Sequence, residues 1–499
     1  MNPGYFSFRL ANKIDTGAGR YQKGRMILKS GESIYFIGIG GNRLSALAKI
    51  YHDRGYRVAG SDRCRTKATR ELEERGIPVD YGHDPKRITK DIDLVVYTNA
   101  VGENNPQLIK ARTERIPVME GAELLGSLMR ETGIGIAVAG THGKTTTTAM
   151  ISLILTRSGK DPTVEVGGEM KELPGNHRTG ASPYIVVEAC EFRRSFLHLS
   201  PKYAVITNVD WDHPDIFPNS GMVVEAFQDF VRLLPPGGGL IAWREEKHFA
   251  ELAAVSKAPV TSFGFTPEAD WSLRHPQPRP PLGAEAELFY GGEYKGCLRL
   301  QVPGEYNLLN AVAALAAGVQ VGVEVEEALA ILEEFQGVKR RFEIKGEAGK
   351  VLVVDDYAHH PVAIAKTLQA ARRHFPGRIW CVFQPHLFSR TRCLLNEFAH
   401  AFNAADILVL ADIYPAREKD PGDISSRILA AEAGKYHGDV RYLGDMASIK
   451  EHLLQEALPG DLIITMGAGD IWKVGEEYLQ EKEGIFVGTG TENLQQQRG

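Results

Sequence analysis

Cysteine is scarce in this chain of 499 residues, which contains only five. The five cysteines lie far apart, and no two of them form a Cys-x-x-Cys pair; they are Cys64, Cys190, Cys297, Cys381 and Cys393. Such spacing argues against a disulfide framework and against a cysteine-based zinc site. A reducing compartment suits the chain, and we expect it in the cytoplasm.

Long apolar runs and excess positive charge are also missing. No apolar run is long enough to span a bilayer, so we expect no membrane insertion. The formal net charge is -5, whereas nucleic-acid binders usually carry a strongly basic face, so we expect no nucleic-acid partner. Residues 1–31 are basic but have no continuous apolar core, which excludes a secretory signal and predicts a disordered extension.

The rest of the composition is that of a soluble globular protein, with 43% hydrophobic and 24% charged residues. The length predicts about three domains. Three blocks each open with an apolar strand that runs into a glycine or acidic turn, at residues 33–41, 134–140 and 350–355. Helical stretches and further apolar strands follow in alternation, which indicates βαβ units on parallel sheets.

These blocks predict an α/β fold with three domains. We expect a Rossmann-like N-terminal domain at residues 32–132, a central P-loop ATPase domain at 133–342 and a Rossmann-like C-terminal domain at 343–482. The polar residues 483–499 are expected to form a flexible tail.

The central domain is expected to carry an antiparallel addition. Strand-like residues 287–290 and 294–300 flank Gly291-Gly292, which is typical of a hairpin. The proline-rich stretch from His275 to Pro281 is predicted to be a loop.

A phosphate-binding loop is the strongest local signal. It follows the strand of the second block and comprises Gly140, Thr141, His142, Gly143, Lys144, Thr145 and Thr146. Glycines let backbone N–H groups face phosphates, and the start of the next helix adds positive potential. Lys144 is expected to contact the outer phosphates of ATP, and the Thr145 hydroxyl to hold Mg2+. Val138 stands where the strict pattern has glycine, so this is a shortened variant.

The glycine turn of the first block is a weaker signal. Gly38, Gly40 and Gly41 resemble a dinucleotide fingerprint, and Asp62 lies about twenty residues further on, where a ribose would be met. Arg43, however, occupies the place of the third glycine. By itself this turn leaves NAD, another nucleotide or no ligand open.

Acidic residues and a histidine follow two strands of the second block. Glu188 and Glu191 come at the end of one strand, and Asp210, Asp212 and His213 follow another. Mg2+ takes oxygen ligands, and phosphates complete its shell. Capping and turn formation would explain these residues equally well without the phosphate loop nearby, but with it they predict a magnesium site.

Two polar loops in the third block lie at carboxyl ends of predicted strands, at residues 355–361 and 384–391. Ligands bind at this edge of open α/β sheets. Two such loops in one domain therefore predict a substrate-facing edge.

Together these motifs resemble the Mur ligase family, from about Ser33 to about Tyr478. The resemblance rests on a series of segments in order along the chain: Gly140–Thr146, Val187-Glu188, Thr207-Asn208, Asp212-His213, Asn307–Ala311, Gly337–Phe342, Asp355–Pro361, Phe383–His386 and Gly467–Asp470. The chain departs from the family pattern at Tyr306, where histidine is common, and at Leu387, where some members carry a second arginine.

The resemblance implies roles for individual residues. Lys144, Glu188, His213 and His359 are the implied catalytic residues. Thr145 and Glu188 are implied to hold one Mg2+, and His213 a second. For ATP it implies that Asn307 and Asn310 meet the adenine, and that Arg341 and Asp356 contact the ribose or phosphates. The implied substrate-binding residues are Gly40, Gly41 and Ser45 for the uridine diphosphate, Arg390 for the carboxylate of the incoming amino acid, and Tyr357.

The implied activity is ATP-dependent joining of L-alanine to the lactyl carboxylate of UDP-N-acetylmuramate through an acyl phosphate, in peptidoglycan precursor synthesis, by a monomer or weak homo-oligomer. A sister ligase that attaches a recycled tripeptide is the nearest alternative, and the segments 339–341 and 384–386 favour alanine. A ligase of folate-like or polyamide acceptors does not need the complete first domain. An NAD-dependent oxidoreductase would leave the Lys144 loop unexplained.

Overall fold

The computed structural model describes residues 21–22, 25–26, 29–170, 172 and 175–482. The predicted tail, 483–499, and residues 1–20 of the predicted extension lie outside this range. Residues Tyr21–Gln22 (β1) and Arg25–Met26 (β2), also in the predicted extension, form a short antiparallel ladder. Within the described ranges, no helix is both long and apolar enough to cross a bilayer. The chain divides into two compact units, 1–120 and 121–499.

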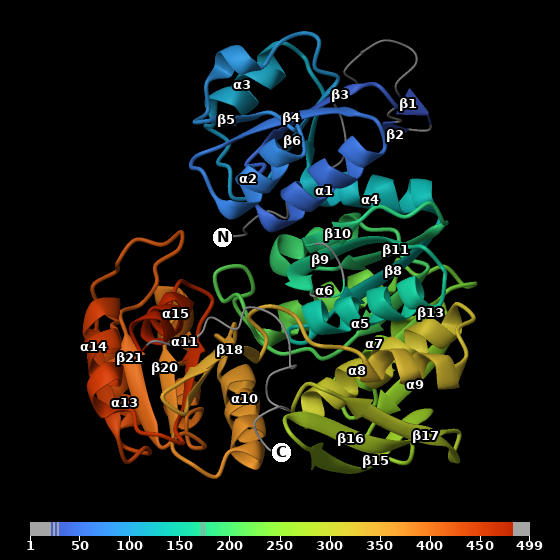
Figure 1. Cartoon of the computed structure of the whole chain (residues 1–499). Coiled ribbons are helices and arrows are strands. Elements are labelled where there is room, and N and C mark those ends of the chain that lie inside the picture. Colours follow the sequence, from blue (N-terminus) through green and yellow to red (C-terminus); the bar gives the residue numbers. More distant parts are fainter. Residues whose placement is uncertain (1–20, 23–24, 27–28, 171, 173–174, 483–499) are drawn as a thin grey trace, which may run out of the picture. The chain divides into compact units, whose positions relative to one another are not determined.

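The first unit contains a five-stranded parallel sheet in the order β5-β4-β3-β6-β7 (Figure 1). Its elements are β3 (Ser33–Ile37), α1 (Asn42–Asp53), β4 (Arg57–Asp62), α2 (Lys67–Glu74), β5 (Val79–Tyr81), η1 (Pro85–Arg87), β6 (Leu94–Tyr97), α3 (Pro106–Thr113) and β7 (Val118–Glu120). Tyr35 and Ile37 of β3 pack with Leu108 and Ala111 of α3 in a buried cluster. The predicted Rossmann-like arrangement of parallel strands and helices is confirmed.

The second unit begins with a ten-stranded sheet in the order β10-β9-β11-β8-β12-β13-β14-β15-β16-β17 (Figure 1). Its strands are β8 (Ile134–Ala139), β9 (Thr163–Met170), β10 (Gly175–Arg178), β11 (Tyr184–Glu188), β12 (Tyr203–Ile206), β13 (Gly239–Trp243), β14 (Val260–Gly264), β15 (Trp271–Arg279), β16 (Gly283–Tyr290) and β17 (Glu293–Leu300). In the order of the sheet, the seven neighbouring strands β9, β11, β8, β12, β13, β14 and β15 run parallel. Strands β10, β16 and β17 are antiparallel additions at its two edges.

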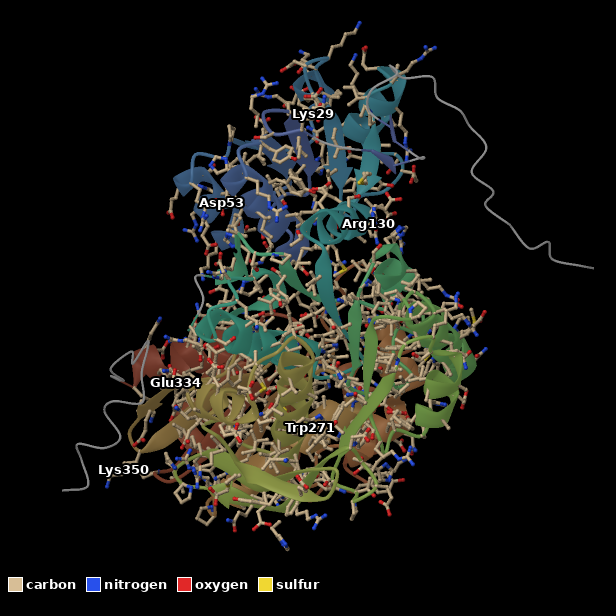
Figure 2. All side chains as sticks on the ribbon, turned by 90° about the vertical axis from the view of Figure 1, so that its right-hand side faces the viewer. Lys29, Asp53, Arg130, Trp271, Glu334 and Lys350 are labelled. Carbon is tan, nitrogen blue, oxygen red and sulfur yellow. The ribbon has the colours of Figure 1, made fainter. Side chains whose placement is uncertain are left out.

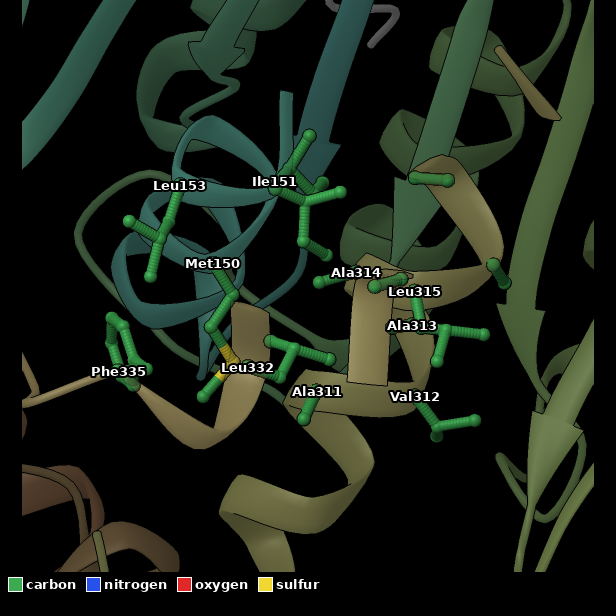
Figure 3. Close-up of a cluster of buried hydrophobic side chains, with 14 of the residues drawn as sticks. Met150, Ile151, Leu153, Ala311, Val312, Ala313, Ala314, Leu315, Leu332 and Phe335 are labelled. Carbon is green, nitrogen blue, oxygen red and sulfur yellow. The ribbon is translucent and has the colours of Figure 1, made fainter. Parts of the chain in front are cut away.

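Successive side chains of β8 point to opposite faces of this sheet, and helices cover both faces. Ile136 and Val138 point into a core with α5 and α8, whereas a Cβ on Gly135, the residue before Ile136, would meet Met129 of α4 at 2.5 Å. The helices of this part are α4 (Gly121–Thr132), α5 (Lys144–Arg157), η2 (Phe192–His198), α6 (Ser220–Val231), α7 (Phe249–Val255), α8 (Glu305–Gln320) and α9 (Val325–Glu333). Figure 3 shows the core between α5, α8 and α9.

Helix α4 packs closely on η2. A Cβ on Gly126 would lie 2.0 Å from the carbonyl oxygen of His198. Arg130, labelled in Figure 2, donates from Nη1 to the Ser200 hydroxyl at 3.0 Å. The domain boundaries expected from the sequence remain predictions.

The predicted hairpin at Gly291-Gly292 is confirmed, because β16 and β17 pair antiparallel on either side of it. The predicted loop from His275 to Pro281 is wrong, because β15 runs from Trp271 (labelled in Figure 2) to Arg279 and pairs with β16. The prolines are tolerated for two reasons. The register is irregular between Arg274 and Gln277, and β14 pairs with β15 only at Trp271 and Ser272, so the later residues need no N–H on that side.

A six-stranded sheet in the order β18-β19-β23-β20-β21-β22 completes the second unit. Only β18 is antiparallel to its neighbour. Its elements are β18 (Glu343–Ala348), β19 (Val351–Asp356), α10 (Pro361–His374), β20 (Ile379–Phe383), α11 (Phe388–Cys393), α12 (Leu395–His400), β21 (Ile407–Ala411), α13 (Ser426–Ala433), β22 (Val440–Gly444), α14 (Met446–Glu456), β23 (Leu462–Met466) and α15 (Trp472–Glu481).

Both faces of this sheet are buried. Val354 and Ile464 belong to one apolar cluster, and their neighbours Val353 and Ile463 belong to another on the opposite face. Continuous apolar strands covered on both sides are typical of parallel α/β sheets. The predicted Rossmann-like C-terminal architecture is therefore confirmed.

Candidate active site

A cavity of about 320 Å3 lies in the second unit, where loops from both of its sheets meet. It is lined by the loop after β8, the ends of β11 to β14, the start of α8, the segment before β18 and the loop between β19 and α10. The sequence-predicted residues that line it are Thr141, His142, Gly143, Lys144, Thr145, Thr146, Glu188, His213, Asn307, Asn310, Arg341, Asp356, Tyr357 and His359. Residues predicted from separate stretches of sequence thus share one cavity.

The phosphate loop depends on two glycines. Gly140 has φ +144°, and a Cβ there would lie 1.9 Å from Thr207 Oγ1. Gly143 precedes α5 with φ +80°, and a Cβ there would lie 2.4 Å from Asn310 Oδ1. Both positions combine a backbone conformation that favours glycine with a close neighbour, so a side chain is excluded at each.

The loop after β12 holds the phosphate loop in place. His142 donates its backbone N–H to Asn208 Oδ1 at 2.9 Å, and the Thr207 hydroxyl donates to the His142 carbonyl at 2.6 Å. The Thr141 hydroxyl donates to the Asp210 carbonyl at 3.0 Å. These bonds set the curvature of the phosphate loop.

Lys144 is buried at the start of α5. Its Nζ donates to the carbonyls of Gly140 and Thr141 and lies 2.9 Å from Glu191 Oε2. Burial acts to lower the pKa of Lys144, but the Glu191 carboxylate, with help from Cys190 and Glu188, outweighs it and leaves that pKa raised. Lys144 is therefore a fixed positive charge in the cavity wall. The sequence places Glu191 just after β11 but does not identify it as the partner of Lys144.

Oxygen ligands suited to Mg2+ lie next to Lys144. The Thr145 hydroxyl donates to Glu188 Oε2 at 2.8 Å, and Gly167 N–H donates to the same oxygen at 3.0 Å. His213 lines the same cavity, and its Nδ1 is buried without a hydrogen-bond partner among the described residues. In the part of the chain that the structure describes, however, no group of three or more His, Cys, Asp or Glu side chains is arranged to hold a metal by itself.

The two asparagines of α8 are bonded to one another. Asn310 Nδ2 donates to Asn307 Oδ1 at 3.2 Å, and Asn307 Nδ2 donates to the Pro303 carbonyl at 2.7 Å. Tyr306 lines the cavity beside them, and burial raises the pKa of its hydroxyl. Their predicted contact with adenine remains a prediction.

Asp356 ends β19 and is buried. It accepts the N–H groups of Phe342 and Ala358 at 2.8 and 2.7 Å. Burial raises the pKa of Asp356 to about 6, although the Arg341 guanidinium opposes that shift. Arg341 lines the cavity, and its guanidinium lies 4.9 Å from the ring centre of Tyr357, so this side of the cavity carries a positive charge.

His359 has a defined tautomer. Its Nδ1 lies 2.8 Å from the Tyr357 carbonyl, which only accepts, so Nδ1 carries the proton and Nε2 is left unprotonated. Burial, together with Arg390, holds the pKa of His359 well below its usual range. His359 is therefore a neutral acceptor in the cavity wall.

Arg390 lies apart from the cavity lining and is buried. Its Nε and Nη2 both lie 2.9 Å from Asp212 Oδ1, so the predicted carboxylate-binding fork meets a carboxylate of this chain. Asp212 does line the cavity. The sequence places Asp212 near the predicted magnesium site but does not pair it with Arg390. The role of Arg390 in amino-acid binding remains a prediction.

The remaining predicted residues, Gly40, Gly41 and Ser45, belong to the first unit. Gly40 N–H donates to Asp62 Oδ2 at 2.9 Å, so Asp62 holds the glycine turn. Ser45 is buried, and its hydroxyl donates to the Asn42 carbonyl at 3.0 Å. Arg43 stands in the first turn of α1. Binding of uridine diphosphate by this turn remains a prediction.

Acid is expected to destabilise the fold through His360. Burial, with His142 nearby, lowers the pKa of His360 from 6.5 to about 4. The folded state thus favours the neutral ring, and below pH 6.5 the unfolded chain binds a proton that the folded chain does not. Stability is therefore lost as pH falls from 6.5 towards 4, by about 2 kcal/mol at pH 5 from this residue.

Denaturant unfolding at pH 7 and pH 5 checks this expectation. His360→Gln should lose about 2 kcal/mol less than the wild type over that interval. His275→Gln, at a side chain that is 79% exposed, serves as the matched control and should behave as the wild type. Equal pH sensitivity of the wild type and His360→Gln would contradict the role of His360.

Models of three known protein-domain families match successive parts of the chain. "Mur ligase family, catalytic domain" matches residues 33–132, "Mur ligase middle domain" matches 138–318, and "Mur ligase, glutamate ligase domain" matches 340–469. The matches thus extend from β3 to the residues just after β23.

Known proteins also match this chain along almost their whole length. The UDP-N-acetylmuramate–L-alanine ligase of Acetivibrio thermocellus is 44% identical over 91% of this chain and 97% of its own length. That of Caldanaerobacter subterraneus subsp. tengcongensis is 42% identical over 91% and 99%. The crystal structure of the UDP-N-acetylmuramate-alanine ligase of Thermotoga maritima has a TM-score of 0.78 at 29% identity, covering 90% of this chain and 99% of that chain. A murein peptide ligase structure from Psychrobacter arcticus has a TM-score of 0.69 at 25% identity, covering 91% and 99%.

Proposed function

The chain belongs to the Mur ligase family, and we propose on that premise that it joins L-alanine to the lactyl carboxylate of UDP-N-acetylmuramate with consumption of ATP. The similarity to L-alanine ligases along almost the whole chain carries this proposal. The product would be a precursor of peptidoglycan, and ATP as a substrate fits a cytoplasmic enzyme. We propose that the enzyme is a monomer or a weak homo-oligomer.

The first step makes the carboxylate reactive. A carboxylate oxygen attacks the γ-phosphorus of ATP, the bond from that phosphorus to the bridging oxygen breaks, and ADP leaves. An acyl phosphate remains on the lactyl group. Lys144 supplies positive charge to the transferred phosphoryl group, and the phosphate loop around Gly143 lines its path. Arg341 adds charge from another part of the cavity wall.

The side chains of Thr145, Glu188 and His213 suit Mg2+. The Thr145 hydroxyl and Glu188 Oε2 already lie 2.8 Å apart, and His213 Nδ1, which has no hydrogen-bond partner among the described residues, can act as a nitrogen ligand. Because Mg2+ usually keeps some of its shell for phosphate oxygens, few protein ligands are needed. When bound, Mg2+ would neutralise charge on the phosphates.

The second step forms the amide. The amine of alanine attacks the acyl carbon, a C–N bond forms, and the C–O bond to the phosphate breaks. Phosphate leaves with the former carboxylate oxygen, and the attacking nitrogen gives up a proton. His359, neutral with a free Nε2, can accept a hydrogen bond beside the reacting groups.

An assay with single amino acids tests the proposal. With ATP, Mg2+ and UDP-N-acetylmuramate, ADP and phosphate should appear with L-alanine, and far less with glycine or L-serine. Oxygen-18 in the lactyl carboxylate should emerge in the released phosphate, because that oxygen bridges carbon and phosphorus in the intermediate. ADP release that requires a tripeptide would instead favour the sister ligase, and unlabelled phosphate would exclude the acyl phosphate.

Replacing Glu188 tests the proposed metal ligand. Glu188→Gln removes the charge next to Thr145, so the Mg2+ concentration needed for half-maximal ADP binding should rise about tenfold, as for loss of one charged contact. Glu169→Gln, whose partner Lys339 lies outside the cavity, is the control and should leave this concentration unchanged. ADP binding by calorimetry avoids dependence on turnover. An unchanged Mg2+ requirement in Glu188→Gln would contradict the assignment.

A further inference from the structure

Lys144 and Glu191 form a buried ion pair in the wall of the cavity. The Nζ atom of Lys144 lies 2.9 Å from Oε2 and 3.1 Å from Oε1 of Glu191. The two side chains are 12% and 4% exposed, and both line the cavity. A carboxylate that faces a cation with two oxygens offers it the same charged acceptors as the edge of a phosphate group. The Glu191 carboxylate therefore resembles the outer phosphate that Lys144 is expected to contact.

The ammonium group of Lys144 has three N–H donors, and acceptors of this chain account for all three. The carbonyl of Gly140 and, at 3.1 Å, the carbonyl of Thr141 take two of them. The Glu191 carboxylate takes the third. A phosphate that bonds to Lys144 must displace one of these acceptors. The two carbonyls belong to the phosphate loop itself, whereas Glu191 follows the end of β11, so Glu191 is the acceptor that can leave while the loop keeps its form.

The segment that carries Glu191 is strained. Arg193 and Arg194, which follow it in η2, have φ of 52° and 55°, in the left-handed region that is costly for residues other than glycine. The Arg194 N–H donates to the Glu191 carbonyl at 2.8 Å, and its guanidinium pairs with Asp229 of α6 at 3.1 Å. Strain of this kind persists only where surrounding contacts maintain it. The pair of Glu191 with Lys144 is one of the contacts that hold this segment in place.

We propose that Glu191 is a positioning residue for Lys144, which holds the ammonium group before ATP binds and is exchanged for the outer phosphate when ATP binds. Binding of ATP then replaces one charged contact of Lys144 by another, so the affinity is lower than the new contact alone would give. Release of the strained segment after Glu191 offsets part of the cost of breaking the pair. The inference rests on the use of ATP in the proposed function and not on the identity of the amino acid.

Calorimetric binding of AMP-PNP, an ATP analogue that is not hydrolysed, tests the exchange. Glu191→Gln keeps the size of the side chain and removes its charge, so the Kd of AMP-PNP should fall about tenfold, as expected when a competing charged contact becomes a neutral one. AMP has no outer phosphate, so its Kd should be the same as in the wild type. Glu71→Gln is the matched control, because Glu71 pairs with the buried Lys49 at 2.8 Å in the first unit, and it should leave both Kd values unchanged.

A crystal structure of the wild-type protein with AMP-PNP gives a test that does not depend on the folding of a variant. Lys144 Nζ should contact an outer phosphate and lie more than about 4 Å from Glu191, beyond the range of an ion pair. An intact pair beside bound AMP-PNP, or an unchanged or raised Kd in Glu191→Gln, would overturn the inference. A fall in Kd seen only with Mg2+ present would make Glu191 a metal ligand and overturn it as well. A wild-type protein that does not bind AMP-PNP would overturn the proposed use of ATP and this inference together.

Discussion

Replacing Lys144 with alanine is expected to lower kcat by about a thousandfold or more, because it removes the fixed cation nearest the transferred phosphoryl group. The Lys144 ammonium is already oriented by the Gly140 and Thr141 carbonyls and by Glu191. It therefore needs little rearrangement when charge develops on the phosphoryl group. Initial rates of ADP release, and hydroxamate formed from the acyl phosphate, measure the loss in the first step directly.

Two controls separate charge from folding. Lys160→Ala, just beyond the end of α5, should retain wild-type rates. Lys144→Ala also leaves Glu191 buried without its cation, so a second variant, Lys144→Met with Glu191→Gln, removes both charges. That double variant should melt near the wild type and still lack activity. Substantial hydroxamate formation by either Lys144 variant would show that the phosphate loop does not act as proposed.

Replacing Gly140 with alanine is expected to destabilise the second unit by about 3–5 kcal/mol, combining backbone strain with a steric clash. The φ of +144° is unfavourable for an L-residue, and the new Cβ would lie 1.9 Å from Thr207 Oγ1. The clash would also displace the hydrogen bond from Thr207 to the His142 carbonyl, so activity should fall with stability. Denaturant unfolding followed by circular dichroism gives the free energy.

Gly159→Ala provides the matched comparison. Gly159 follows α5 with φ +72°, and a Cβ there would meet no atom of the described residues within 4 Å. Only backbone strain remains at this position, so a loss of about 1 kcal/mol is expected. Removing the clashing hydroxyl as well, in Gly140→Ala with Thr207→Ala, should recover part of the difference. Equal losses for Gly140→Ala and Gly159→Ala would contradict the steric argument.

The sequence predicts the parallel sheets well because each strand carries a continuous apolar run followed by a glycine or acidic turn. Residues 134–140 and 350–355 are two such runs. The observed strands β8 and β19 agree with them to within one residue at each end. The sequence does not reveal β15, because its prolines and polar residues are typical of a loop. Its ladder to β16 depends on long-range pairing, which local preference does not show.

Some contacts of the candidate site could likewise be predicted from the sequence, and others could not. Lys144, Thr145 and Glu188 lie at or just beyond strand ends, so their convergence could be predicted from parallel topology. The contact of Asp212 with Arg390 could not, because 178 residues separate them and no periodicity links the two loops. Only the packing of one sheet's loops on the other's brings these charges together.

The prolines of β15 also bear on how copies of this protein meet in solution. Beyond Ser272, the strand pairs with no residue of β14, so its backbone on that side would be a template for a strand from another molecule. Pro276 and Pro278 have no N–H to offer, and the register is irregular between Arg274 and Gln277. This margin of the sheet is thereby protected against intermolecular strand addition, which favours solubility at the concentrations at which a biosynthetic enzyme works.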